Sequence, residues 1–145
     1  DLLKQQTVPV WGPHADDGYL LESLPQTTAS YASYGFPIAE AFVPDGWLSE
    51  GGKLKVGAYE FDVLHIPGHT PGHVVFYCAA EKLLIAGDVL FYESIGRTDF
   101  PRGNHADLIS NITGKLLVLP EDTRVIPGHG RMTTIGHEKR HNPFL

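Results

Sequence analysis

The sequence predicts an α/β fold, and three observations support that class. The middle of the chain carries three short apolar runs of strand length, rich in Val, Ile, Phe and Tyr and bounded by Pro and Gly. Further on, apolar residues from Leu108 to Leu117 recur at helical spacing, and a fourth apolar run follows them. A strand–helix–strand unit is therefore expected. The four predicted strands are Phe61–Ile66, Val74–Cys78, Leu83–Ala86 and Thr123–Ile126.

The first twelve residues resemble a βαβ unit without its first strand. Asp1–Gln6 has the residues of the end of a helix, and Thr7–Gly12 reads as a short strand closed by Gly12-Pro13. Together they form the second half of a βαβ unit. The first residue is Asp1 and the only methionine is Met132, so we expect the chain to be a piece of a longer protein.

The next segment is less regular. Asp16 and Asp17 suit the first turn of a helix, because acidic side chains favour its positive end, and Pro25 is expected to end that helix. Gln26–Pro37 is expected to be irregular or weakly helical. Val43–Leu48 reads as a turn running into a short strand.

Two turns and a long loop organise the rest. Glu50–Gly52 is predicted to be a hairpin turn before the strands Leu54–Val56 and Tyr59–Ile66. Val89–Gly103 is a long loop, and loops of this length in compact domains are usually functional. Asn104 is a good N-cap for the helix that follows.

The end of the chain is predicted to be helical, and one domain is expected. Pro120–Asp122 ends the helix that Asn104 caps, and Met132–His141 forms a last helix that stops before Asn142-Pro143. We find no repeat and no linker in the 145 residues, so residues 1–145 are expected to form a single domain.

Composition excludes several classes of partner. The net charge of −6 argues against nucleic acid, which needs a basic face. No apolar run approaches the ~20 residues that span a bilayer, so no membrane partner is expected. The single cysteine, Cys78, cannot form an internal disulfide and is expected to be buried in its strand. A cytoplasmic location is consistent with that pattern.

Three polar residues stand where predicted strands end. His69, Asp88 and His129 each follow an apolar strand within a few residues, and each lies in or beside a Gly-rich turn. Neutral imidazole and carboxylate are ligands that suit zinc and also accept iron or manganese. The three residues therefore predict a metal site at the ends of neighbouring strands.

The motifs around these residues resemble those of a known family. PGHTPGH, then AGD, then PGHG, each after a strand, resemble the later motifs of the metallo-β-lactamase-fold hydrolases, most closely the glyoxalase II-like (hydroxyacylglutathione hydrolase) group. FPRG and the closing HNPFL resemble the short bacterial members, which lack an added C-terminal helical domain. The resemblance covers essentially the whole chain and implies an αββα sandwich.

The resemblance also implies roles for individual residues. His69 would bind one metal ion, Asp88 would bridge two, and His129 would bind the second. His73 would lie behind the ligands as a second-shell residue. Were the register of PGHTPGH shifted, His73 would be the ligand in place of His69.

One departure from the family pattern is large. The family's main signature, THxHxDH at the end of an earlier strand, is absent, and His14 stands in a context that does not match it. The chain therefore resembles the C-terminal two-thirds of the family domain, without its N-terminal strands. Three ligands cannot fill two zinc sites that need about four each, so the chain is expected to bind metal poorly or not at all.

The implied activity is hydrolysis of a thioester such as S-lactoylglutathione by metal-bound hydroxide, with Asp88 as the central catalytic residue. Zinc is the expected metal, with iron or manganese possible. The partner would be a small glutathione-derived thioester, and Arg97 or Arg102 would contact one of its carboxylates.

Two alternatives remain at this point. Gly96–Phe100 also resembles the persulfide dioxygenase branch of the same superfamily, which uses one iron ion, although His73 argues against that branch. The other alternative is a catalytically incomplete fragment without activity.

Overall fold

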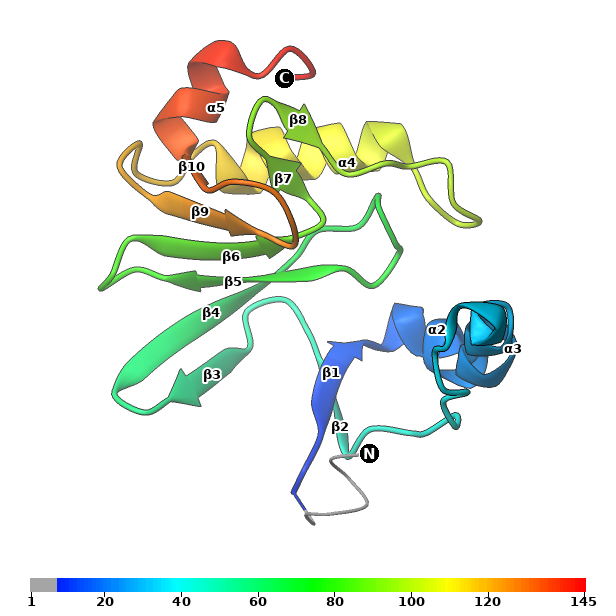
Figure 1. Ribbon diagram of the computed structural model, residues 1–145. Helices are drawn as coiled ribbons and strands as arrows, with labels where there is room; N and C mark the ends of the chain where they lie inside the picture. The colour runs from blue at the N-terminus through cyan, green and yellow to red at the C-terminus, as the bar shows by residue number, and fades with distance from the viewer. Residues whose placement is uncertain (1–7) are drawn as a thin grey trace. The chain divides into compact units, whose positions relative to one another are not determined.

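The computed structural model describes residues 8–145 of the chain (Figure 1). The predicted helix Asp1–Gln6 lies outside these residues. The chain divides into two compact units, Asp1–Leu48 and Ser49–Leu145. The single-domain organisation of residues 1–145 stays a prediction.

The first unit holds a short parallel strand pair and a series of short helices. Its strands, β1 (Trp11–His14) and β2 (Gly46–Leu48), pair in parallel, so the short strand predicted within Val43–Leu48 is confirmed. Gly12-Pro13 was expected to close the first strand, but both residues lie inside β1. Gly12 fits there because its φ is +94°, a value that favours glycine.

The helical segments of this unit correct another prediction. Pro25 does not end the helix that begins after Asp17. It lies in the first turn of α3, where proline is tolerated because the backbone N–H groups there have no intrahelical partner. The segments are η1 (Ala15–Asp17), α2 (Gly18–Glu22), α3 (Leu24–Ala29) and η2 (Ala32–Tyr34).

The second unit is built on a six-stranded sheet with the order β10-β9-β6-β5-β4-β3. β5 is antiparallel to β4 and to β6, whereas β9 is parallel to β6. The strands β4, β6 and β9 therefore run in the same direction, which places their C-terminal ends at one edge. The predicted central strands are confirmed. Their bounds are β3 (Lys53–Val56), β4 (Tyr59–His65), β5 (Val74–Cys78), β6 (Leu83–Gly87), β9 (Arg124–Pro127) and β10 (Thr133–Thr134).

The hairpin turn of this sheet is not where the sequence predicted it. β3 pairs antiparallel with β4, and the turn between them is Gly57-Ala58, with Gly57 at a φ of +62°. Glu50–Gly52 does form a turn, but it precedes β3 and joins no strand pair. Both segments carry glycine, so composition alone did not separate them.

Helices pack on the sheet of the second unit (Figure 1). Asn104 caps α4 (His105–Asn111) as predicted, since its Oδ1 accepts a hydrogen bond from the Asp107 N–H at 3.2 Å. α4 continues into the π-helical segment η3 (Ile112–Leu116), and α5 (Ile135–His141) closes the chain. The crossover from β6 through α4 to the parallel strand β9 confirms the strand–helix–strand unit.

One buried cluster joins these helices to the strands. It contains fully buried side chains from the sheet, from α4 and η3, and from the start of α5. Burial of such side chains is the main force that holds the helices on the sheet. The largest are Ile66, Leu84, Leu90, Leu108, Ile112, Leu116 and Ile135. Cys78 is also buried, as predicted.

The long loop after β6 is partly regular. Residues 89–103 were predicted to be one loop, but they contain a small antiparallel hairpin, β7 (Leu90–Phe91) and β8 (Ser94–Ile95). Strands of two residues give no periodic pattern, so the sequence could not reveal them. Within residues 8–145, no helix is long and apolar enough to span a bilayer.

Candidate metal centre

The topology of the sheet gathers three predicted residues at one edge. His69 follows β4, Asp88 follows β6 directly, and His129 follows β9. Because these three strands run in the same direction, their C-terminal ends lie at the same edge of the sheet. A rigid sheet thus fixes the stems, and the loops present the polar groups.

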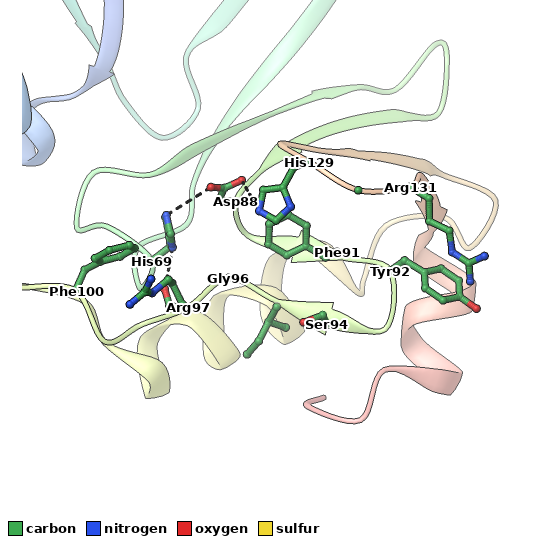
Figure 2. Close-up of a pocket in the computed structure, with 12 residues that line it drawn as sticks. His69, Asp88, Phe91, Tyr92, Ser94, Gly96, Arg97, Phe100, His129 and Arg131 are labelled. Carbon is green, nitrogen blue, oxygen red and sulfur yellow. Dashed lines mark hydrogen bonds and ion pairs between the residues drawn. The ribbon is translucent and has the colours of Figure 1, made fainter. Parts of the chain in front are cut away.

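Asp88 lies between the two imidazoles (Figure 2). Its Oδ2 is 3.9 Å from Nε2 of His69, and its Oδ1 is 3.9 Å from Nε2 of His129. Two ligand atoms that each lie about 2.1 Å from one ion are at most about 4.2 Å apart. Both separations are within that limit, and each carboxylate oxygen faces a different imidazole. The structure thus brings together the three residues predicted to bind metal.

A hydrogen bond determines which nitrogen of His69 is available. Nδ1 of His69 lies 2.8 Å from the backbone carbonyl oxygen of Arg97. A carbonyl oxygen only accepts, so Nδ1 carries the proton and Nε2 keeps its lone pair toward Asp88. The side chain is only 13% exposed, and its ring meets the edge of Phe100 with 5.4 Å between centroids. This is the usual way in which proteins orient a histidine ligand.

His129 is held by stacking. Its ring lies on Phe91 of β7 with 4.4 Å between centroids and an angle of 28° between the planes. The His129 side chain is 75% exposed, and it forms no hydrogen bond with another of residues 8–145. Aromatic contact with the β7–β8 hairpin is therefore the main restraint on this ring.

Glycine leaves room for the carboxylate. A Cβ atom at Gly128 would lie 2.2 Å from Oδ1 of Asp88, closer than any real contact. A Cβ at Gly96 would lie 2.0 Å from the Asp88 carbonyl oxygen. Gly128, the first glycine of PGHG, and Gly96, which follows β8, are thus both required for Asp88 to occupy its position.

His73 lies behind the three residues. Its ring is 5.7 Å from that of His69 in an edge-to-face arrangement, and a Cβ on Gly87 would lie 2.8 Å from its Nε2. His73 does not line the pocket described next. This position is compatible with a supporting role, which stays a prediction, as do the ligand roles of His69, Asp88 and His129.

A pocket of about 530 Å³ opens in front of Asp88. Arg97 lines it, but its guanidinium is bound by the Asp99 carboxylate through Nε at 2.7 Å and Nη2 at 2.6 Å. That ion pair raises the pKa of Arg97 and lowers the pKa of Asp99. Arg102 does not line the pocket. Substrate binding by either arginine stays a prediction.

Sequence reasoning missed several residues of this pocket, and three of them matter most for the argument below. Phe91 and Tyr92 come from the β7–β8 hairpin, and Arg131 follows the PGHG turn. The aromatic residues of the long loop were a signal that this segment is ordered, but not of where they point. Arg131 stands two residues after His129, so its proximity to the site could have been inferred from the sequence.

The donor set fits a metal ion. Two imidazole nitrogens and both oxygens of one carboxylate are chemically suitable for zinc, iron or manganese. His69 presents its unprotonated nitrogen toward Asp88, which is the form a ligand needs. Among the three residues His69, Asp88 and His129, only the carboxylate can contact two ions at once.

Comparison with known proteins identifies a superfamily and a relative that spans more than this chain. A model of the metallo-beta-lactamase superfamily matches residues 1–129. Hydroxyacylglutathione hydrolase GloC of Haemophilus influenzae is 50% identical over 139 residues. That match covers 95% of this chain and 64% of the relative, so the chain spans about two-thirds of its length.

Solved structures show the same fold. The crystal structure of BLEG-1 B3 metallo-beta-lactamase superposes with a TM-score of 0.83 at 43% identity. The structure of TTHA1623 in a di-iron-bound form superposes with a TM-score of 0.82 at 38% identity. Each match covers 99% of this chain and 68% of the other. The predicted α/β class and family resemblance are therefore confirmed.

Proposed function

Since the chain belongs to the metallo-beta-lactamase superfamily, we propose that it is a metal-dependent hydrolase of thioesters of the hydroxyacylglutathione hydrolase type. Its substrate would be a small glutathione-derived thioester such as S-lactoylglutathione. The identity of 50% to a hydroxyacylglutathione hydrolase supports this substrate class. The observation that carries the proposal is the Asp88 carboxylate facing an imidazole on each side at 3.9 Å.

The residues that would hold metal are His69, Asp88 and His129. A bound metal ion lowers the pKa of water and polarises a carbonyl group, which is the chemistry that thioester hydrolysis requires. Zinc is the metal we propose, and iron is the competing choice because the solved structure of TTHA1623 is a di-iron-bound form.

The remaining pocket residues would position the substrate. Phe91 and Phe100 approach the site from two sides, each against one imidazole. Their rings would flank the thioester and reduce the access of bulk water to it. The Arg97 backbone carbonyl keeps the proton of His69 on Nδ1, so that Nε2 does not carry a proton toward the reacting group.

The test compares two proteins. One is the 145-residue chain, and the other, called the extended protein below, carries these residues after the upstream segment of the Haemophilus relative. Both are assayed for S-lactoylglutathione hydrolysis and for bound metal by elemental analysis. We expect hydrolysis by the extended protein, lost on chelation and restored by zinc or iron, and little by the shorter chain. Metal-loaded extended protein without hydrolysis, but with oxygen uptake on a glutathione persulfide, would favour the dioxygenase branch instead.

A further inference from the structure

Two arginines line the pocket on opposite sides of Asp88 (Figure 2). On one side, Arg97 pairs with both carboxylate oxygens of Asp99, and its guanidinium also lies 4.3 Å from the centre of the Phe100 ring. Its charge is therefore already balanced by a neighbour, and its fork of donors is occupied. A substrate anion would have to displace Asp99 to use it.

Arg131, on the other side, has no such partner. Among residues 8–145, no carboxylate forms an ion pair with its guanidinium, which lies 3.2 Å from the centre of the Tyr92 ring. The pKa of Glu93 is lowered mainly by hydrogen bonds from the Tyr92 side chain and from His137, whose Nε2 lies 3.0 Å from Oε1, and the charge of Arg131 contributes least. The edge of the Arg131 guanidinium thus keeps its donors available.

The platform beneath Arg131 is firmly held. The Tyr92 ring stacks on His137 of α5 with 4.7 Å between centroids. The next residue, Glu93, has a φ of +52°, and its N–H donates to Oε2 of the buried Glu138 at 2.9 Å. A side chain fixed on such a surface loses less conformational entropy when it binds a ligand.

We propose that Arg131, stacked on Tyr92, is the subsite that binds a carboxylate of the thioester substrate. This inference rests on the proposed function, and it moves the anion contact from Arg97 and Arg102 to Arg131. One face of the guanidinium is covered by the ring, so the planar edge remains for a two-pronged contact with a carboxylate. Figure 2 shows Arg131 directed away from Asp88, which suits a carboxylate remote from the scissile bond.

The test measures binding of two probes that are not hydrolysed. S-hexylglutathione carries both carboxylates, and its diethyl ester carries neither. Affinities are measured by calorimetry for the extended protein, for Arg131→Gln and for Arg124→Gln, an exposed arginine of β9 outside the pocket. We expect the unsubstituted protein to bind S-hexylglutathione about fivefold more tightly than the diethyl ester, which is the upper range for an exposed ion pair. Arg131→Gln should abolish that preference, Arg131→Lys should retain part of it, and Arg124→Gln should leave it unchanged.

Three outcomes would overturn the subsite. They are an unchanged preference in Arg131→Gln, an equal loss in Arg124→Gln, and failure of the unsubstituted protein to distinguish or bind the probes. Hydrolysis of S-lactoylglutathione is measured on the same samples. Acid-selective binding that depends on Arg131, without hydrolysis, would sink the proposed activity and leave the subsite standing. Hydrolysis without acid-selective binding would overturn the subsite and leave the proposed activity standing.

Discussion

The imidazoles of His69 and His129 lie at the same distance from the Asp88 carboxylate, but different contacts hold the two rings in place. Each places Nε2 3.9 Å from one carboxylate oxygen. His69 is 13% exposed and donates its other ring N–H to a backbone carbonyl, whereas His129 is 75% exposed and rests on Phe91. A hydrogen bond determines both the tautomer and the ring orientation, but stacking leaves the tautomer open. The same apparent geometry is thus held rigidly on one side and loosely on the other.

This difference follows from the elements that carry the supports. His69 lies in the turn after the long strand β4, and that turn is tied to the start of α4 by the Asn104 N–H bonded to the Gly68 carbonyl at 2.8 Å. Phe91 belongs to a hairpin of two-residue strands, which needs outside support to be stable. α5 provides that support through Glu138. The position of the His129 ring therefore depends on the packing of α5 against the β7–β8 hairpin.

The largest effect should come from the residue that both sides share. Asp88→Asn keeps the shape of the side chain but removes its charge and one acceptor, so both sides lose their common ligand. We expect metal affinity of the extended protein to fall more than about 100-fold, beyond the usual cost of losing a supporting residue. Titration with zinc checks this. Asp122→Asn, an exposed carboxylate outside the pocket, should leave the affinity unchanged, and a comparable loss there would contradict the assignment.

A smaller effect should follow from crowding the carboxylate. Gly128→Ala would place a methyl group 2.2 Å from Oδ1 of Asp88, on the side that faces His129. We expect Asp88 to shift and metal affinity to fall by about 10- to 100-fold. Thermal stability should change less, because the closest contact is with a side-chain tip and the Gly87 backbone carbon lies farther away, at 3.2 Å. Gly114→Ala is the matched control, since nothing lies within 4 Å of the added carbon. Equal affinities for the two variants would refute the crowding argument.

The third prediction tests, through protein stability, the support that Glu138 gives to the β7–β8 hairpin beside His129. The Glu138 carboxyl is fully buried and accepts hydrogen bonds from the Glu93 N–H at 2.9 Å, the Asn142 amide at 2.8 Å and the Thr133 hydroxyl. Glu138→Gln replaces one acceptor by a donor and should cost about 1–3 kcal/mol of unfolding free energy. Denaturant unfolding measures the cost. Glu81→Gln, on an exposed turn, should be neutral.

The smallest expected effect on metal affinity comes from removing the aromatic rings that contact His129 and His69, and it tests which imidazole is held more firmly. Phe91→Ala removes the one aromatic ring that contacts His129 among residues 8–145. Phe100→Ala removes an edge contact of His69, which keeps its hydrogen bond. We expect metal affinity to fall about two- to tenfold for Phe91→Ala, the range of one aromatic pair, and less for Phe100→Ala. If Phe100→Ala proves the more damaging change, the two supports have been ranked wrongly.

The sequence predicted the parts of the site that lie next to regular strands. His69, Asp88 and His129 were found because β4, β6 and β9 are long enough to show an apolar pattern and end in Gly-rich turns. The hairpin turn was misplaced and Pro25 misread because glycine and proline mark a break in regular structure without specifying its type.

The supports of the site were not predictable from residue types. The Arg97 group that orients His69 is a backbone carbonyl, which every residue possesses. The pairing of Arg97 with Asp99 depends on the path of an irregular loop. The sequence therefore could not show which arginine near the pocket has its guanidinium already occupied by a carboxylate. The β7–β8 hairpin depends on contacts with α5, about 45 residues away, and such long-range contacts override local preference.

Anomalous diffraction from crystals of the extended protein grown with zinc tests the central claim most directly. The account predicts an ion about 2.0–2.2 Å from an oxygen of Asp88 and from Nε2 of His69 or His129, with Nδ1 of His69 still bonded to the Arg97 carbonyl. Zinc bound elsewhere while all three side chains remain without an ion would contradict it.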